Sequence, residues 1–221
     1  AVLILEPDTE KRLQSVYRIL KSLDQFLNFY PDDGGCDEGP AYWAGAAGVL
    51  IGGYQLLNAA TGNHFDYLFE NELIVNMGSY PYKVYMGNGY VANFADSSPA
   101  VGIYGSGMMF RYGSAIGDKT LKSYGAFLWE DSADYFKSGA IAFHRMFDLM
   151  AWEEMSRYPG EEPLVFDSWL PDLQVMTARS VKNSIESFSI AAKGGHNDES
   201  HNHNDIGNFI VYYTGEPLFI D

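Results

Sequence analysis

The sequence contains few basic residues. It has 14 Lys and Arg against 29 Asp and Glu, which gives a formal net charge of −15 at pH 7. A chain with this balance offers no general surface for nucleic acid or for an anionic membrane. An anionic substrate is still compatible with it, because a few local cations can invert the field inside a cleft. We therefore predict no nucleic-acid partner.

Cysteine and long apolar runs are also scarce. Cys36 is the single cysteine, so no disulfide can form within the chain. No apolar run approaches the roughly 18 residues of a membrane helix, so we predict no membrane insertion, and no signal peptide is visible. Because the chain starts at Ala1 and stops at Asp221 directly after an apolar run, we expect it to be an excerpt of a longer protein.

Hydrophobic and aromatic residues, in contrast, are abundant. Hydrophobic residues make up 47% of the chain and charged residues 19%, which predicts a packed core and argues against disorder. The 16 Tyr, 14 Phe and 4 Trp are an aromatic content common in carbohydrate-binding clefts and equally in ordinary cores. A length of 221 residues allows one large domain, or one domain with part of a second.

Helical periodicity dominates the first two-thirds of the chain. Its apolar residues recur at spacings of three and four, and Asp8 and Pro40 occupy an N-cap and a first-turn position. The helix after Pro40 holds so many glycines that we expect another helix or a ligand to approach its backbone closely. We expect helices at residues 9–28, 40–58, 65–77, 118–129 and 132–157, and a loop at 85–99.

From about residue 163 the period changes to two. Segments with strand-like alternation are 164–169, 173–181, 184–192 and 208–221, the last with a hairpin turn at residues 214–216. Helices followed by strands predict an all-α domain over residues 1–162 and the start of an antiparallel β domain over residues 163–221. Successive antiparallel helix pairs are compatible with an α/α toroid.

The stretch GGHNDESHNHNDIGNF, residues 194–209, holds three of the five histidines. On an extended chain, His201 and His203 point the same way and can line one cavity. Imidazole is a common zinc ligand and the natural acid or base near neutral pH. Asp205 and Asp221 can complete a metal site or orient a ring through its second nitrogen. The alternative is a polar turn with solvated histidines.

The stretch DDGGCDEGPAYW, residues 32–43, places Glu38 and Tyr42 four positions apart at the start of a predicted helix. There they can face one cleft. A tyrosine in such a place can act as an acid or base if nearby cations lower its pKa from about 10. The alternative is that the acids cap the helix and that Tyr42 is a core aromatic residue.

A third stretch, GNGYVANFADSS at residues 87–98, offers Tyr90, Asn93 and Asp96. A structural loop between helices is the favoured interpretation of it. Five cations are possible contacts for an anionic group, although each taken singly is more simply a solvated surface charge: Lys83, Arg111, Arg179, Lys182 and Lys193.

Together, these stretches resemble the heparinase II/III-like polysaccharide lyases. The matching pieces are DGGCDEGPAYW, GNGYVANFADS and KGGHNDESHNHNDIGNFIVYYTGEPLFID. The last is the most specific, because the family's β domain carries a similar H-N-H-N-D run followed by an apolar hairpin and an Asp. The resemblance implies an α+β multidomain fold, an α/α toroid followed by an antiparallel β-sandwich, in a periplasmic or secreted protein.

The resemblance also implies a reaction and a site. In such lyases a tyrosine on the toroid and a histidine from the β domain perform β-elimination on a uronic acid in an acidic polysaccharide. By position in the motif, Tyr42 resembles that tyrosine and His201 resembles that histidine. His203 and Asp221 resemble two ligands of the family's structural zinc, whose third ligand would lie beyond residue 221. The residue that neutralises the substrate carboxylate would fall before Ala1. We further expect substrate contacts from Glu38, Tyr90, His196, Asn202 and Arg179.

Three other functions remain open. A uronate C5-epimerase would use the same constellation and reprotonate the intermediate on its other face. A glycoside hydrolase would use Glu38 and Asp96 as carboxylates about 5–9.5 Å apart across a cleft. A non-catalytic glycan-binding protein would use the aromatic residues and the acidic surface. The net charge of −15 favours a carboxylated or modestly sulfated glycan over a highly sulfated one.

Overall fold

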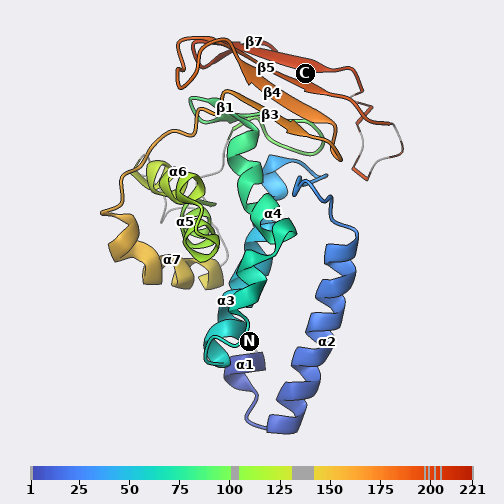
Figure 1. Ribbon diagram of the computed structural model, residues 1–221, viewed down its shortest axis with the longest axis vertical. Coiled ribbons are helices and arrows are strands. Elements are labelled where there is room, and N and C mark those ends of the chain that lie inside the picture. The colour runs from blue at the N-terminus through green and yellow to red at the C-terminus, as the bar shows by residue number, and fades with distance from the viewer. Residues whose placement is uncertain are drawn as a thin grey trace.

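A five-stranded antiparallel sheet lies across one end of a set of helices in the computed structural model of the chain (Figure 1). The structure describes residues 2–100, 105–130, 142–196, 198, 200, 201, 203, 204 and 206–220. Over these residues the fold combines helices with antiparallel sheets, which agrees with the α+β class predicted from the sequence. No helix in this part of the chain is both long enough and apolar enough to cross a bilayer.

The helices occupy the first part of the chain and the main sheet the last. The α-helices are α1 Val2–Leu5, α2 Thr9–Asn28, α3 Val49–Ala60, α4 Glu72–Lys83, α5 Ser106–Ile116, α6 Lys119–Glu130 and α7 Ala142–Met155. Short helical turns η1 Pro40–Tyr42 and η2 Ala44–Gly48 lead into α3, and η3 Asp66–Glu70 precedes α4. A hairpin comprises β1 Tyr85–Gly87 and β2 Tyr90–Val91. The main sheet comprises β3 Asp167–Leu170, β4 Val175–Arg179, β5 Phe188–Lys193, β6 Phe209–Tyr213 and β7 Glu216–Phe219.

Local signals in the sequence place several helix ends correctly. The side chain of Asp8 accepts a hydrogen bond from the backbone N–H of Lys11 at 3.1 Å, so it caps α2 as predicted. Pro40 is the first residue of η1, also as predicted. Residues 65–77 are mostly helical as expected, but they do not form one helix. Asn71 ends η3 and caps a new helix, α4, by accepting from the N–H of Ile74.

Helix α5 and the β1–β2 hairpin are absent from the sequence-based prediction. In α5 the eight consecutive residues from Ser106 to Gly113 are all buried. A helix buried on every side shows no alternation of apolar and polar residues, so its period is invisible in the sequence. The hairpin lies in the stretch 85–99 that we expected to be a loop, and its strands are only three and two residues long.

The glycines of η2 and α3 only partly behave as predicted. A Cβ atom on Gly48 would overlap the side chain of Met108, so at this position α5 does approach the backbone closely. At Gly45, Gly52 and Gly53 a Cβ would meet no described atom within 4 Å apart from chain neighbours and the backbone of their own helix. No described helix therefore approaches these three glycines closely, and a ligand beside them stays a prediction.

The main sheet is a meander in which each strand pairs with the next one along the chain. The hairpin between β6 and β7 turns through Thr214 and Gly215, with φ of 50° and 76°, between the paired residues Tyr213 and Glu216. Positive φ at both turn residues is the geometry that suits the twist of a two-residue hairpin. The turn therefore lies where the sequence predicts it, although Glu216 already belongs to β7.

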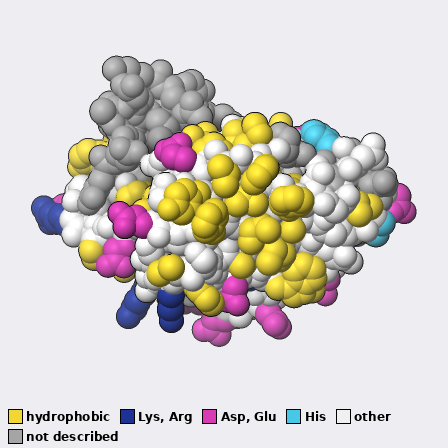
Figure 2. Space-filling model, turned by 90° about the horizontal axis from the view of Figure 1, so that it is seen from above, with side chains coloured by type: hydrophobic (Ala, Val, Ile, Leu, Met, Phe, Trp, Pro, Cys, Tyr) yellow, Lys and Arg dark blue, Asp and Glu magenta, His cyan; other side chains and the backbone are white. Residues whose placement is uncertain are grey.

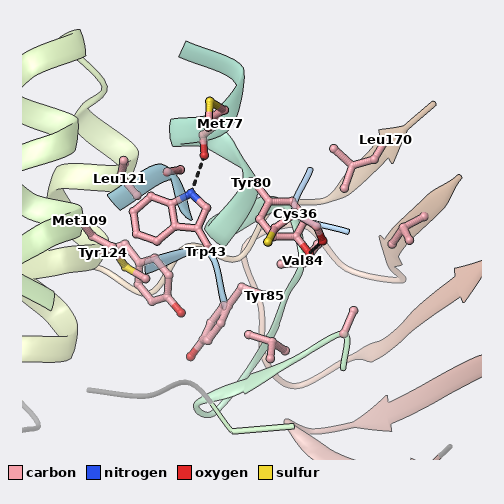
Figure 3. Close-up of a cluster of buried hydrophobic side chains, with 14 of the residues drawn as sticks. Cys36, Trp43, Met77, Tyr80, Val84, Tyr85, Met109, Leu121, Tyr124 and Leu170 are labelled. Carbon is pink, nitrogen blue, oxygen red and sulfur yellow. Dashed lines mark hydrogen bonds between the residues drawn. The ribbon is translucent and has the colours of Figure 1, made fainter. Parts of the chain in front are cut away.

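Helices and sheet share a hydrophobic core. Trp43, Tyr80 and Val84 from the helical part lie in the same buried cluster as Leu170 from the sheet (Figure 3). Ile210 of β6 belongs to this cluster too. The indole N–H of Trp43 donates to the carbonyl of Met77 at 2.7 Å, which satisfies its one polar atom (Figure 3). The chain changes from helix to strand between α7 and β3, and this core continues across the change.

Polar side chains also fasten the sheet to the helices. The buried carboxylate of Asp33 accepts hydrogen bonds from the N–H groups of Gly35 at 2.8 Å, Asp172 at 2.8 Å and Leu173 at 3.1 Å. The carboxylate of Asp172 in turn accepts from the N–H of Asp33 at 3.0 Å. This reciprocal pair ties the segment before η1 to the β3–β4 turn.

Arg179 is a second polar residue that links the sheet to the rest of the fold. Its guanidinium is buried and donates to the carbonyls of Val165 at 3.0 Å, Met86 at 3.0 Å and Tyr85 at 2.6 Å. Burial lowers the pKa of Arg179. Arg111 and Lys193 are buried too, whereas Lys182 is exposed. The interpretation as a solvated surface charge is therefore wrong for Arg111, Arg179 and Lys193.

Candidate functional site

The loop between β5 and β6 brings two histidines into contact with two carboxylates from distant parts of the chain. Nε2 of His201 lies 3.0 Å from Oε1 of Glu38, and Nδ1 of the same ring lies 2.7 Å from Oδ2 of Asp96. Nε2 of His203 lies 2.6 Å from Oδ1 of Asp96. These four residues form the carboxylate–histidine cluster.

Close packing of two loops holds the carboxylates of the cluster near each other. Gly39 has φ of 95°, and a Cβ on it would lie 2.7 Å from Cβ of Ser97. The hydroxyl of Ser97 also accepts a hydrogen bond from the N–H of Ala41 at 3.1 Å. Glycine is the residue that combines this backbone conformation with this close approach. The turn that carries Glu38 therefore lies directly against the loop that carries Asp96.

The histidine-bearing loop is closed at its base by backbone hydrogen bonds. The N–H of Gly207 donates to the carbonyl of Lys193 at 2.9 Å, and the N–H of Lys193 donates to the carbonyl of Asn208 at 3.0 Å. The N–H of Gly194 donates to the carbonyl of Gln174 at 2.7 Å. The loop thus leaves and returns to the sheet at one point, at the end of β5.

The backbone of this loop differs from the extended chain that we predicted. His201 has φ of 54°, in the left-handed region, so the alternation of side chains along a strand does not apply to it. The two rings still converge, because both reach the two oxygens of Asp96. Their common direction comes from a turning loop and a shared partner.

Charges in the cluster shift two pKa values in opposite directions. The hydrogen bond that His201 donates to Asp96, together with the negative charges of Glu38, Asp96 and Asp37, raises the pKa of His201. Hydrogen bonds from His201 and His203 lower the pKa of Asp96. A protonated His201 can donate from both nitrogens, one to each carboxylate. The side chains of His201 and Asp96 remain 40% and 35% exposed, so solvent screens these charges.

Tyr42 lies in η1 and lines a hollow of about 510 Å³ together with Glu38. Its side chain is about half exposed, so the alternative that it is a core aromatic residue is wrong. Because Glu38 also touches His201, the hollow and the carboxylate–histidine cluster are adjoining parts of one surface.

The remaining predicted residues lie apart from this hollow or outside the described chain. Tyr90 is partly buried, and its ring packs 5.4 Å from that of Tyr212. His196 is exposed and pairs with Asp198. Asn202 and Asp221 lie outside the described residues. Arg179 is buried between the sheet and the helices, where its guanidinium donates hydrogen bonds to three backbone carbonyls.

The cluster holds ligand types that zinc accepts, since His203 and Asp96 supply an imidazole and a carboxylate. Within the described residues, no group of three or more His, Cys, Asp and Glu side chains is arranged to hold a metal ion. Asp221, the predicted partner of His203, lies outside them. A zinc site at His203 therefore stays a prediction.

Asp96 is the residue whose role the sequence did not reveal. It binds both histidines of the cluster, whereas the sequence suggested a structural loop or, as an alternative, a hydrolase carboxylate at this position. No short-range pattern connects it to residues that lie more than 100 positions further along the chain. Only the packing of the two loops around Gly39 brings Asp96 to the site.

No family model matches the chain, and no curated protein matches it.

Proposed function

We propose that the protein is a polysaccharide lyase that cleaves an acidic, uronate-containing polysaccharide by β-elimination. Tyr42 and His201 form the acid–base pair, one from the helical part and one from the β5–β6 loop. The observation that carries this proposal is the position of Glu38, which lines the hollow beside Tyr42 and lies 3.0 Å from His201. The carboxylate of Glu38 thus lies beside both candidate catalytic groups, in one hollow with Tyr42 and in contact with His201.

The residue types suit the chemistry. The C5 proton of a uronate is weakly acidic, so its removal requires groups that offset the carboxylate charge while an enolate-like intermediate develops. One group must take the proton and another must donate one to the departing O4 oxygen. The raised pKa of His201 keeps its imidazole protonated to higher pH than usual, which supports a proton-donating role. The epimer of the uronate, through syn or anti elimination, decides how Tyr42 and His201 divide these steps.

Among the predicted substrate-binding residues, Glu38 is the best placed, because it faces the hollow. His196 belongs to the same loop as His201 and is exposed, so it stays a candidate. Arg179 is not part of the proposal, since its guanidinium already donates to three carbonyls.

The proposal retains zinc, with His203 and Asp221 as ligands and a third ligand outside this chain. Zinc would steady the β5–β6 loop there. A periplasmic or secreted location belongs to the same proposal.

The outer face of the main sheet supports the β-sandwich part of the expected fold. The face seen from above carries a broad apolar area (Figure 2). The strand register puts large side chains that are about half exposed on one face of the sheet: Trp169, Phe188, Phe209, Tyr213 and Phe219. Apolar patches of this kind mark surfaces that another element covers. We propose a second sheet packed over this face and an α/α toroid for the helices.

The geometry of the cluster argues against a glycoside hydrolase built on Glu38 and Asp96. The imidazole of His201 stands between their carboxylates and contacts each through one nitrogen. A hydrolase needs that space for the glycosidic bond. The two carboxylates are therefore better explained as partners of His201.

Ultraviolet absorbance tests the proposal, because β-elimination creates an unsaturated uronate that absorbs where the substrate does not. The full-length protein is mixed with heparan, chondroitin, alginate and related polymers, and we expect the absorbance to rise with at least one. The absence of a rise with every polymer would contradict the proposal. Solvent deuterium at C5 without chain cleavage would instead indicate an epimerase.

A further inference from the structure

The hollow beside Tyr42 combines aromatic rings with negative charge. Phe26 and Phe29 at the end of α2 line it together with Tyr42, and Phe29 is 90% exposed. The ionisable carboxylates on its wall belong to Asp37 and Glu38, from the turn before η1. Among the described residues that line it there is no Lys, Arg or His.

Several basic residues of the described chain are held away from this hollow. Arg179 and Lys193 are buried in the joint between helices and sheet, and Arg111 is buried beside Asp148. Lys119 lines a separate hollow beside α6, and Lys122 contacts Glu154 of α7. A protonated His201, 3.0 Å from Glu38, offsets the charge of that carboxylate. The negative charge of the wall therefore comes chiefly from Asp37, and no described residue that lines the hollow is a cation.

This lining matches one class of ligand. The apolar C–H face of a sugar ring packs on an exposed aromatic ring, and sugar hydroxyls donate hydrogen bonds to carboxylates. A sulfate group offers acceptors only and carries a negative charge, so Asp37 would repel it. At contact distance this repulsion acts well inside the Debye length of about 8 Å at physiological salt.

We propose that this hollow binds an unsulfated, uncharged sugar ring next to the uronate, and that it rejects polymers with a sulfate on that ring. The inference rests on the proposed function for the identity of the neighbouring uronate. Phe26, Phe29 and Tyr42 supply the stacking surface, and Asp37 supplies discrimination against sulfate. Glu38 lines the hollow and at the same time holds His201.

Matched polymer pairs test this specificity. Binding of unsulfated chondroitin and chondroitin sulfate, and of heparosan and heparan sulfate, is measured by titration calorimetry with the full-length protein. We expect the unsulfated member of a bound pair to bind about tenfold more tightly, which corresponds to roughly 1.4 kcal/mol. Equal or tighter binding of the sulfated member, or no binding of any of the four polymers, overturns the proposal.

A variant and its control test whether the hollow causes the preference for unsulfated polymer. Asp37→Asn keeps an oxygen that can accept the N–H of Glu38, as Oδ1 does at 3.0 Å, and removes the charge. We expect it to reduce the preference severalfold, while the control Asp32→Asn, an exposed carboxylate outside the hollow, leaves the preference unchanged. An unchanged preference in Asp37→Asn overturns the proposal.

Phe29→Ala tests the stacking surface. We expect weaker binding of the unsulfated polymer with an unchanged melting temperature, because the ring is exposed. A lower melting temperature with unchanged binding would mean that protein covers the hollow, and this overturns the proposal. Binding requires no cleavage, so a preference for unsulfated polymer without any unsaturated product would count against the lyase function and leave this inference standing.

Discussion

Nε2 of His201 lies 3.0 Å from Oε1 of Glu38, so a loop of the main sheet touches the turn that leads into η1. The contact joins the two stretches of sequence that carry the clearest chemical signals. It places a histidine beside a hollow lined by a half-exposed tyrosine. The proposed reaction depends on this meeting of the helical part with the β5–β6 loop.

Asp96→Asn tests how the loop is held. The carboxylate of Asp96 binds both His201 and His203, and the amide offers one acceptor oxygen where the carboxylate offers two. Misplacing a reacting group by about 1 Å can cost roughly 100-fold in rate. We expect kcat for polymer cleavage to fall by about 10- to 100-fold, as measured from the initial rate.

The control for this variant is Asp32→Asn, which makes the same change at an exposed carboxylate outside the cluster and the hollow. We expect it to keep the rate within about twofold, because surface substitutions away from a site have little effect. Equal losses in the two variants would show that Asp96 has no special role.

Cys36 gives a pH-dependent prediction. The thiol is buried, and burial raises its pKa to about 11. An unfolded cysteine ionises near pH 8.5. The neutral thiol therefore contributes stability that is fully present below about pH 8.5 and is lost as the pH rises toward 11. Urea unfolding between pH 7 and pH 10 should show the loss, and Cys36→Ala should reduce the slope.

The same burial predicts slow alkylation. At pH 8 iodoacetamide should label Cys36 only as fast as the protein opens, and labelling should become rapid in concentrated urea. Rapid labelling of the folded protein would mean that the thiol is accessible.

Asp33→Ala should weaken the attachment of the sheet to the helices. It removes a buried acceptor of three backbone N–H groups, from Gly35, Asp172 and Leu173. We expect the free energy of unfolding to fall by about 3 kcal/mol, since buried donors are left unsatisfied. Denaturant titration measures the change. The exposed neighbour Asp32→Ala should change it by less than about 0.5 kcal/mol.

A pair of glycine substitutions tests the packing of the helices. A Cβ on Gly125 of α6 would lie 2.6 Å from backbone atoms of Phe110 and of Ser106 in α5. We expect Gly125→Ala to destabilise the fold by about 2 kcal/mol. Gly52→Ala in α3 meets no described atom and should stabilise the fold by up to about 1 kcal/mol, because alanine favours helix. The melting temperatures of both variants measure these changes, and a Gly125→Ala variant as stable as the wild type would contradict the packing of α6 against α5.

The sequence predicts those features of the fold that depend on neighbours along the chain. Asp8, Pro40 and the turn at Thr214 and Gly215 act through local backbone geometry, and each lies where it was expected. Helix α5 could not be predicted in this way, because burial on all sides removes its periodicity. The break at Asn71 was missed because apolar residues continue on both sides of it.

The candidate site divides in the same way. Glu38, Tyr42 and His201 stand out by residue type, and the structure brings Glu38 to His201 and to the hollow beside Tyr42. Asp96 joins them through packing between distant loops, which leaves no local pattern. Arg179 was expected at a ligand because it is a cation, but its partners are backbone carbonyls, which a sequence does not display.

The most direct test of the account is the initial rate of unsaturated-uronate formation by the full-length protein and four variants. Tyr42→Phe and His201→Ala should each lower kcat by about 100- to 10,000-fold, the contribution of a general acid or base. Tyr67→Phe and His64→Ala, which alter an exposed tyrosine and an exposed histidine away from the hollow, should keep the wild-type rate. Undiminished formation of unsaturated product by Tyr42→Phe or His201→Ala would contradict the account.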